Sequence, residues 1–348
     1  MGIHKNFNPN DLGLTNGNLY GLPFSVKEAN FVIIPVPWEV TTSYGCGAAQ
    51  GPAAILNASL QVDLYEPEIK DAWKLGLAML PISKTWLNKN KLLKKKAAIC
   101  IRHLEKGGQP ADSEVKKSYQ EINAAGAELN NWVKQESLKL LEQGKAVGVL
   151  GGEHSAPLGV MQALAQKYQQ YSILHLDAHM DSRSCYEGFE FSHASVIYNA
   201  ARIKNIVKIA QAGARDYCEE EADFIENSRG RMVAFTDRMI RRQLFGGTLW
   251  QTISREIIKP LSSEVYVSFD IDALEPSLCP NTGTPVPSGF NFEQALYLIE
   301  AVVKSGRKII GFDLCEVAPG ENSEWDANVG ARVLWRLVNL VAQSQGKF

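Results

Sequence analysis

The sequence predicts an α/β fold with three layers, α/β/α, in which a mainly parallel sheet of about eight strands lies between two layers of helices. Strand-like and helix-like segments alternate along most of the chain, which is typical of a parallel sheet with crossover helices. Several of the strand-like segments are continuous apolar runs, as expected of strands buried on both faces. No internal repeat or long linker is found, so a single domain over residues 1–348 is expected.

Eight strands are expected where apolar, β-branched runs are bounded by turn residues, at Phe31–Val36, Leu75–Leu80, Ala146–Leu150, Ser172–Leu176, Ile206–Ala210, Met232–Phe235, Val265–Ile271 and Lys308–Leu314. The longest helix is expected at Ser113–Gln143, because apolar residues recur there every three or four positions and Gly144 follows as a stop signal. Shorter helices are expected at Pro157–Gln169, Cys218–Asn227, Asp237–Phe245, Phe292–Ser305 and Ala327–Gln343.

A lysine-rich stretch at about residues 84–117 interrupts this alternation and carries nine lysines. Such a run of charge binds a polyanion in some proteins, but a solvated insertion that leads into the long helix is the favoured interpretation. Cover for an active-site mouth and an oligomer contact are both open as roles for this insertion.

Composition and charge narrow the class of protein. A net charge of -2 gives no electrostatic reason to expect nucleic acid or an anionic membrane as a partner. The longest apolar stretches fall far short of the roughly 20 residues that span a bilayer, and the polar N-terminus lacks the core of a signal peptide. The six cysteines are scattered, as expected of reduced thiols. A cytoplasmic enzyme is therefore expected.

Three short segments place metal-ligating residue types at the ends of apolar runs, namely Gly151-Gly152-Glu153-His154, Asp177-Ala178-His179-Met180-Asp181 and Asp270-Ile271-Asp272. Alternate residues of a strand point to one face, so Asp177, His179 and Asp181 are expected to converge. The paired glycines permit a tight turn that presents His154 at the carboxyl edge of the sheet, where open α/β sheets bind their ligands.

Together these segments offer two histidines and four aspartates, a mixed N/O set that suits Mn²⁺ or a similar divalent ion. Six ligands with four carboxylates are too many for one ion but suit two bridged ions, because the four carboxylates then roughly cancel the metal charge, so the sequence predicts a two-metal hydrolase. A surface ion-pair ladder is disfavoured, because these groups would be costly to bury unpaired. His175 is expected to lie behind the site as a core or ligand-supporting residue.

The three segments resemble the signature motifs of the ureohydrolase family, which includes arginases and agmatinases. Residues 41–55 are similar to the family's N-terminal glycine-rich motif, and residues 311–319 to the late strand that carries a substrate-binding glutamate. The resemblance covers about residues 31–65 and 146–337. It implies an arginase-like fold and hydrolysis of a guanidino compound to urea and an amine.

The resemblance also implies two Mn²⁺ ions per subunit bridged by a hydroxide, with Ni²⁺ conceivable for the same ligands. The family pattern assigns one ion to His154 and Asp181, the other to His179 and Asp272, and both ions to Asp177 and Asp270. The hydroxide would attack the guanidinium carbon, and Asp181 would pass its proton towards the leaving amine. A homo-oligomer, trimeric or hexameric, is implied by the resemblance alone.

Two further catalytic residues follow from the same resemblance. His193 would be the proton shuttle, because an imidazole of near-neutral pKa moves protons in both directions. Glu316 would form a charge-assisted pair with the planar guanidinium of the substrate. An ion pair between Glu316 and an arginine such as Arg332 is the structural alternative.

The stretch Phe189-Glu190-Phe191 bears on the substrate, because arginases have a Ser-x-Asn there to hold an amino acid. An apolar wall with one acidic group suits a substrate whose tail is an amine or absent, and Gly213–Asp216 also resembles agmatinases. Agmatine is therefore the first expected substrate. Ala194-Ser195 stands where many agmatinases have Gly-Thr, so guanidinobutyrate, guanidine, formimidoylglutamate and arginine stay open.

Two other classes of protein are weighed against this prediction. A single-zinc amide deacetylase needs only one Asp/His/Asp set, so the presence of both His154 and Asp272 argues against it. An inactive scaffold should have lost at least one of the six ligands, and none is missing.

Overall fold

The computed structural model describes residues 7–347 and contains, within this range, one sheet of eight strands in which every neighbouring pair is parallel. The strand order is β2-β1-β3-β8-β7-β4-β5-β6. The strands are β1 Phe31–Val36, β2 Leu77–Met79, β3 Ala146–Gly151, β4 Tyr171–Leu176, β5 Ile206–Ala212, β6 Met232–Phe235, β7 Glu264–Asp270 and β8 Lys308–Cys315. The prediction of an α/β fold with a parallel sheet of about eight strands is confirmed.

The helices are α1 Gly51–Ser59, α2 Lys84–Glu105, α3 Lys116–Glu142, α4 Leu158–Lys167, α5 Val196–Ala201, α6 Glu219–Glu226, α7 Asp237–Phe245, α8 Trp250–Ile258, α9 Phe292–Lys304 and α10 Trp325–Ser344. The six predicted helices correspond to α3, α4, α6, α7, α9 and α10, with ends that differ by at most three residues. Sequence analysis missed α1, α2, α5 and α8.

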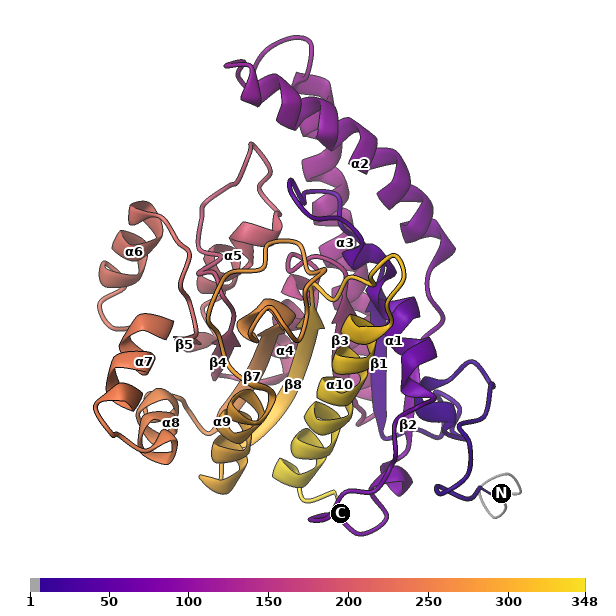
Figure 1. Ribbon diagram of the computed structural model, residues 1–348. Coiled ribbons are helices and arrows are strands. Elements are labelled where there is room, and N and C mark those ends of the chain that lie inside the picture. The colour runs from indigo at the N-terminus through magenta and orange to yellow at the C-terminus, as the bar shows by residue number, and fades with distance from the viewer. Residues whose placement is uncertain (1–6, 348) are drawn as a thin grey trace.

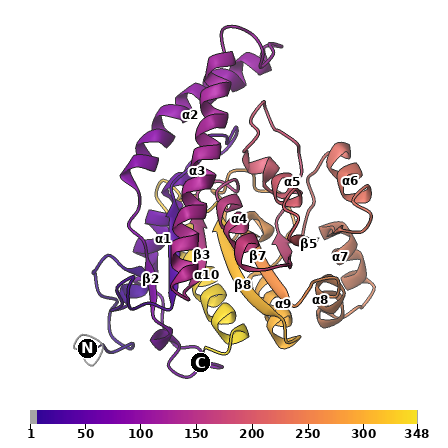
Figure 2. The same ribbon diagram turned by 180° about the vertical axis from the view of Figure 1, so that it is seen from behind.

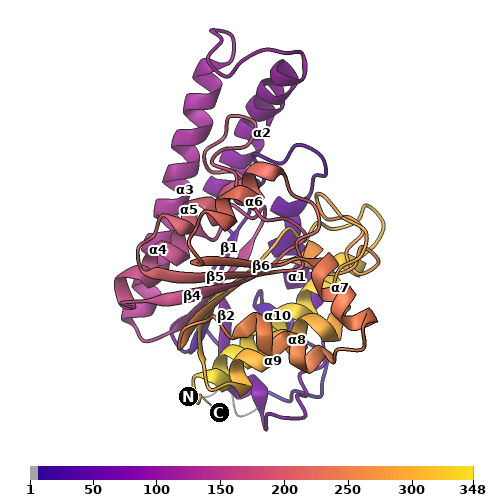
Figure 3. The ribbon, with the colours of Figure 1, turned by 90° about the vertical axis from the view of Figure 1, so that its left-hand side faces the viewer.

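The sheet separates two helical layers, as Figure 3 shows. One layer contains α1, α8, α9 and α10, and its apolar core includes Phe269, Leu298 and Leu334. The other layer contains α3, α4 and α5, with Val133, Met161 and Tyr266 in its core; Figure 2 shows α3 and α4 in front of the sheet on this side. Because helices cover both faces of the sheet, the side chains on both faces of its strands are buried. This explains the continuous apolar runs of the sequence.

The lysine-rich stretch forms α2, which pairs with α3 in a long hairpin that extends past the carboxyl edge of the sheet (Figure 1). Trp86, Leu93, Ala97 and Cys100 are the buried residues that give α2 its apolar stripe. The many lysines on the other faces hid this spacing from sequence analysis. No helix among residues 7–347 is both long enough and apolar enough to pass through a membrane.

Candidate functional site

His154 lies at the carboxyl end of β3, just beyond the Gly151-Gly152 turn. A Cβ atom at Gly152 would stand 2.0 Å from the backbone oxygen of Trp38, so only glycine fits this turn. The turn directs Nδ1 of His154 at three carboxylates that come from other parts of the chain. The distances from Nδ1 are 2.9 Å to Asp177 Oδ2, 3.2 Å to Asp181 Oδ2 and 3.1 Å to Asp270 Oδ2.

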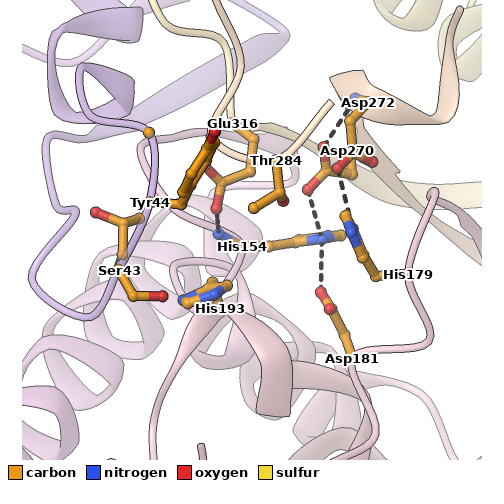
Figure 4. A pocket seen from close by; sticks show the side chains of 13 residues that line it. Ser43, Tyr44, His154, His179, Asp181, His193, Asp270, Asp272, Thr284 and Glu316 are labelled. Atoms are coloured by element: carbon orange, nitrogen blue, oxygen red, sulfur yellow. Dashed lines mark hydrogen bonds and ion pairs between the residues drawn. The ribbon is translucent and has the colours of Figure 1, made fainter. Parts of the chain in front are cut away.

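A second group of ligand atoms surrounds His179. Its Nδ1 lies 3.1 Å from Asp272 Oδ2 and 3.4 Å from Asp177 Oδ1. The two carboxylate oxygens of Asp177 therefore face different histidines, and Asp177 joins the two groups. Figure 4 shows His154 and His179 with Asp181, Asp270 and Asp272 beside them. The structure brings together all six side chains that the sequence predicted to be metal ligands.

The cause of this convergence differs from the one expected. β4 ends at Leu176 and β7 ends at Asp270, so strand alternation does not extend to the later ligands. Asp181 lies in the following loop with a left-handed φ of 50°, and Asp272 lies in a 3₁₀ turn. The loops after the strands, rather than the pleat of the strands, direct these side chains to one place.

Backbone N–H groups hold one oxygen of several carboxylates. Asp177 Oδ1 accepts a hydrogen bond from His179 N at 2.6 Å, and Asp270 Oδ1 accepts one from Asp272 N at 2.9 Å. Asp272 Oδ1 accepts a third from Ala178 N at 3.0 Å. In each case Oδ2 of the same carboxylate faces a histidine.

His175 lies behind the cluster, as expected of a supporting residue. Its Nε2 is 3.0 Å from Asp177 Oδ2. Its Nδ1 accepts a hydrogen bond at 3.0 Å from Nε2 of Gln211, which fixes the ring orientation. A second histidine thus constrains the carboxylate that joins the two groups of ligands.

The cluster concentrates negative charge in a buried place. Burial and the neighbouring Asp177 raise the pKa of Asp181 to about 6, and burial with Asp272 and Asp177 raises the pKa of Asp270 well above its usual range. Burial alone would lower the pKa of His154, but the hydrogen bonds that its ring donates to the carboxylates raise it well above normal. The donors are carboxylate oxygens and imidazole nitrogens, which divalent cations prefer. The buried negative charge of the carboxylates also requires compensating positive charge, and a pair of divalent cations fits both features.

A pocket opens over the cluster, and three loops form its mouth. Residues 42–45 make one side, Gly283 and Thr284 make another, and His193 faces them. Gly45 donates a backbone hydrogen bond of 3.1 Å to Gly283 O, which joins the first two loops. The loop that contains Gly283 and Thr284 therefore forms part of the pocket wall.

Glu316 also lines this pocket, at the end of β8. Its Oε1 accepts a hydrogen bond of 2.8 Å from His154 N, whereas its Oε2 is buried without a partner. Burial and the nearby Glu153 raise its pKa well above the usual range. Arg332 bonds to Asn328 instead, so the alternative ion pair with Arg332 does not form. An unpartnered carboxylate oxygen beside the cluster is suited to a cationic substrate group.

His193 faces the cluster from the loop that follows Asp181. Its Nδ1 lies 3.3 Å from Thr41 Oγ1, and its backbone N donates to the same hydroxyl at 3.2 Å. Burial, together with the charge of His179, lowers the pKa of His193 to about 4. The imidazole is therefore neutral near pH 7, and its pKa lies below the near-neutral value expected from the sequence.

Glu153 supports this arrangement, and sequence analysis gave it no role. Its Oε2 accepts from Thr41 N at 2.8 Å and its Oε1 accepts from Ser155 Oγ at 2.6 Å. Burial raises its pKa to about 7. Its place beside His154 in an otherwise apolar and glycine-rich turn was the available sign that it has a structural partner.

The predicted apolar wall of the pocket is wrong. Phe189 is fully buried against Tyr119 of α3, with ring centroids 5.3 Å apart. Phe191 packs over Gly126 of the same helix, and Glu190 is exposed. Among residues 7–347, those that line the pocket include neither phenylalanine. Hydrophobic burial against α3 turns both rings away from the site, which loop sequence alone does not reveal.

Comparison with known proteins agrees with this geometry. The arginase family model matches residues 29–339. N(1)-aminopropylagmatine ureohydrolase of Thermus thermophilus is 30% identical over 324 residues, which cover 92% of this chain and 93% of that protein. Agmatinase of Bacillus anthracis is 26% identical, with 85% and 86% covered.

Solved structures show the same fold. Agmatine ureohydrolase of Thermoplasma volcanium has a TM-score of 0.72 at 22% identity, covering 96% of this chain and 97% of that chain. Arginase of Bacillus subtilis has a TM-score of 0.62 at 20% identity, with 90% and 98% covered. The chain belongs to the arginase family, and the prediction of a ureohydrolase-family enzyme is confirmed.

The buried carboxylates predict a large effect of divalent ions on stability. Adding Mn²⁺ to chelator-treated protein should raise the free energy of unfolding by about 2.7 kcal/mol when the free ion is at 100 times its Kd, because the ion binds only the folded cluster. Urea unfolding with and without Mn²⁺ measures this. Asp177→Asn should lose most of the response and of the bound metal. Asp223→Asn, on the exposed face of α6, is the matched control and should respond as wild type. An equal response in Asp177→Asn would contradict the joining role of Asp177.

Proposed function

We propose that the protein hydrolyses a guanidino compound to urea and an amine at a two-metal centre, and that agmatine, which would give putrescine, is the first candidate substrate. The observation that carries the proposal is the unpartnered Oε2 of Glu316 in the same pocket as the six-residue cluster. A guanidinium beside this carboxylate would lie over the ligand groups. The names of the relatives support the same chemistry.

The six clustered residues would hold the two ions. His154 and Asp181 are proposed for one ion, His179 and Asp272 for the other, and Asp177 and Asp270 for both. The two-sided contacts of Asp177 support its bridging role. When bound, two Mn²⁺ ions would supply a hydroxide nucleophile near neutral pH and balance the carboxylate charge.

The protein's own residues orient the substrate and move protons. Glu316 would pair with the guanidinium and present its central carbon to the cluster. A water oxygen bonds to that carbon, and the bond from the carbon to the alkyl-bearing nitrogen breaks. Asp181 would take the proton of the attacking water and pass it towards the leaving nitrogen. His193, neutral at pH 7, would exchange protons between the leaving amine and solvent.

A substrate with a second amine, of the aminopropylagmatine type, is the other candidate. The relative at 30% identity carries that name. In addition, Glu187 lies beside Ser43 at the pocket mouth, and its Oε2 is buried without a partner. Burial raises the pKa of Glu187, and the carboxyl of Glu105 raises it further. A distal ammonium group would satisfy this carboxylate.

We also propose that the chain is organised as one domain, built in the described residues 7–347 around the eight-stranded sheet, with residues 84–117 as an insertion. A homo-oligomer, trimeric or hexameric, and a cytoplasmic location stay predictions.

The proposal is tested by urea release from the Mn²⁺-loaded protein. Agmatine and aminopropylagmatine should give the highest kcat/KM. Arginine and guanidinobutyrate carry a carboxylate in the tail, and guanidine has no tail, so all three should be poorer. Formimidoylglutamate, which carries two carboxylates and would release formamide instead of urea, should also be poorer when formamide is measured. Glu316→Gln should lower kcat/KM for every substrate by ~10²-fold or more, since its charge pairs with the part that all of them share. Urea from none of them, with two ions bound, would overturn the substrate class.

His193→Ala should retain its metal content but lose turnover by roughly 10²–10⁴, the usual contribution of general acid–base catalysis. Steady-state kinetics together with metal analysis separates the two effects. His103→Ala, whose ring lies at the far tip of the hairpin beside Asp112, is the matched control and should keep wild-type turnover. A wild-type rate for His193→Ala would mean that the proton follows another route.

Glu187→Gln distinguishes the two candidate substrates. If the longer substrate places its second amine at Glu187, its KM should rise by ~10-fold in this variant, and the KM for agmatine should change by less than ~3-fold. Glu190→Gln, an exposed glutamate in the same loop, should change neither value. Equal effects of Glu187→Gln on both substrates would rule out a subsite that recognises the distal amine.

A further inference from the structure

One lysine of the lysine-rich helix α2 is set apart by its contacts. Lys94 Nζ lies 2.7 Å from Glu39 Oε1 and donates to Thr42 Oγ1 at 2.9 Å. Its side chain is 23% exposed, whereas the neighbouring Lys91 and Lys95 are exposed. Lys94 thus joins the hairpin to the loop that follows β1.

Glu39 connects Lys94 to the end of the loop. Its Oε2 accepts backbone hydrogen bonds from Gly47 N at 2.7 Å and Ala49 N at 3.1 Å. Its own backbone N donates to Asn90 Oδ1 at 2.7 Å, one turn before Lys94 on α2. One carboxylate therefore links the beginning of the loop to its end, and α2 holds Glu39 from two positions, Lys94 at the carboxylate and Asn90 at the backbone N–H.

The segment enclosed by these bonds is the pocket wall at residues 42–45. It has no regular secondary structure, and Tyr44 at its tip is 84% exposed. The segment is held by the bond between Gly45 and Gly283, by the contact of Ser43 with Glu187, and by the contacts of Thr42 with Glu39 and Lys94. The backbone N of Thr41 donates a hydrogen bond to Glu153. The contact between Thr41 and His193 therefore does not depend on Lys94.

The second helix of the hairpin holds the opposite wall. Asn123 of α3 accepts from Glu190 N at 2.9 Å and donates to Gly188 O at 3.3 Å. These bonds fix the loop that carries Glu187 and His193. The hairpin therefore contacts both walls of the pocket, from residues that do not themselves line it.

We propose that Lys94 is a positioning residue for substrate binding, and that the α2–α3 hairpin sets the shape of the pocket mouth while the sheet edge sets the chemistry. The inference rests on the proposed function. Without the ammonium group, the Glu39 carboxylate would be left largely buried and without its cation, so it would turn towards water and release Gly47 and Ala49. The wall at residues 42–45 would then lose its fixed position.

The test compares Lys94→Met with Lys94→Arg and with the control Lys95→Met, all in the full-length Mn²⁺-loaded protein. For agmatine, Lys94→Met should raise KM by ~10-fold or more with kcat within ~3-fold and metal content unchanged, because the ligands, Glu316 and His193 belong to other segments. Lys94→Arg keeps the charge and the donors and should recover most of the affinity. Lys95→Met should behave as wild type.

Hydrogen exchange provides a readout that does not need activity. The amides of Gly47 and Ala49 should exchange at least ~10-fold faster in Lys94→Met than in Lys95→Met. Equal exchange and equal KM in the two variants would overturn the proposal, as would a fall in kcat and metal content that matches the rise in KM. If the wild-type protein released no urea, the proposed function would fail, and the exchange rates would still decide whether Lys94 positions the loop.

Discussion

Four aspartate carboxylates and two histidines lie in contact at the carboxyl edge of the sheet, and this concentration of buried charge governs the arrangement around it. Such a cluster is unfavourable unless cations compensate it. The protein reduces the cost with backbone N–H groups that bind one oxygen of Asp177, Asp270 and Asp272. The remaining oxygens face the histidines, so the atoms that could bind a metal ion converge at one place.

The parallel sheet makes this concentration possible. The central strands β3, β8, β7 and β4 are neighbours, and each ends beside the site. Each of these strands brings one residue to the site, although the strands are far apart in the sequence. β7 ends with Asp270, and β3, β8 and β4 are followed by His154, Glu316 and Asp177. Helices on both faces bury the strands, so the edge is held rigidly, and the loops that follow the strands direct the remaining ligands from this fixed base.

The pocket mouth is built differently from the cluster beneath it. Its walls are loops, and the α2–α3 hairpin holds them through polar contacts from Lys94, Asn90 and Asn123. A change in these contacts would alter the mouth without moving the sheet edge. The same sheet edge is therefore compatible with different loop shapes. The similar proteins carry names that refer to different guanidino compounds.

Sequence alone determined the strands, most of the long helices and the six clustered residues, because apolar periodicity and residue type are local properties that tertiary contacts here reinforce. The paired glycines before His154 also indicated a tight turn. The structure adds that Gly152 lies so close to the backbone of Trp38 that no side chain fits there. The directions of loop side chains were decided only by the tertiary structure. Phe189 and Phe191 turn towards α3 because that helix supplies apolar surface, and Lys94 reaches Thr42, 52 residues earlier, because α2 packs beside the loop. No periodicity encodes such contacts, because each depends on an element that is distant along the chain.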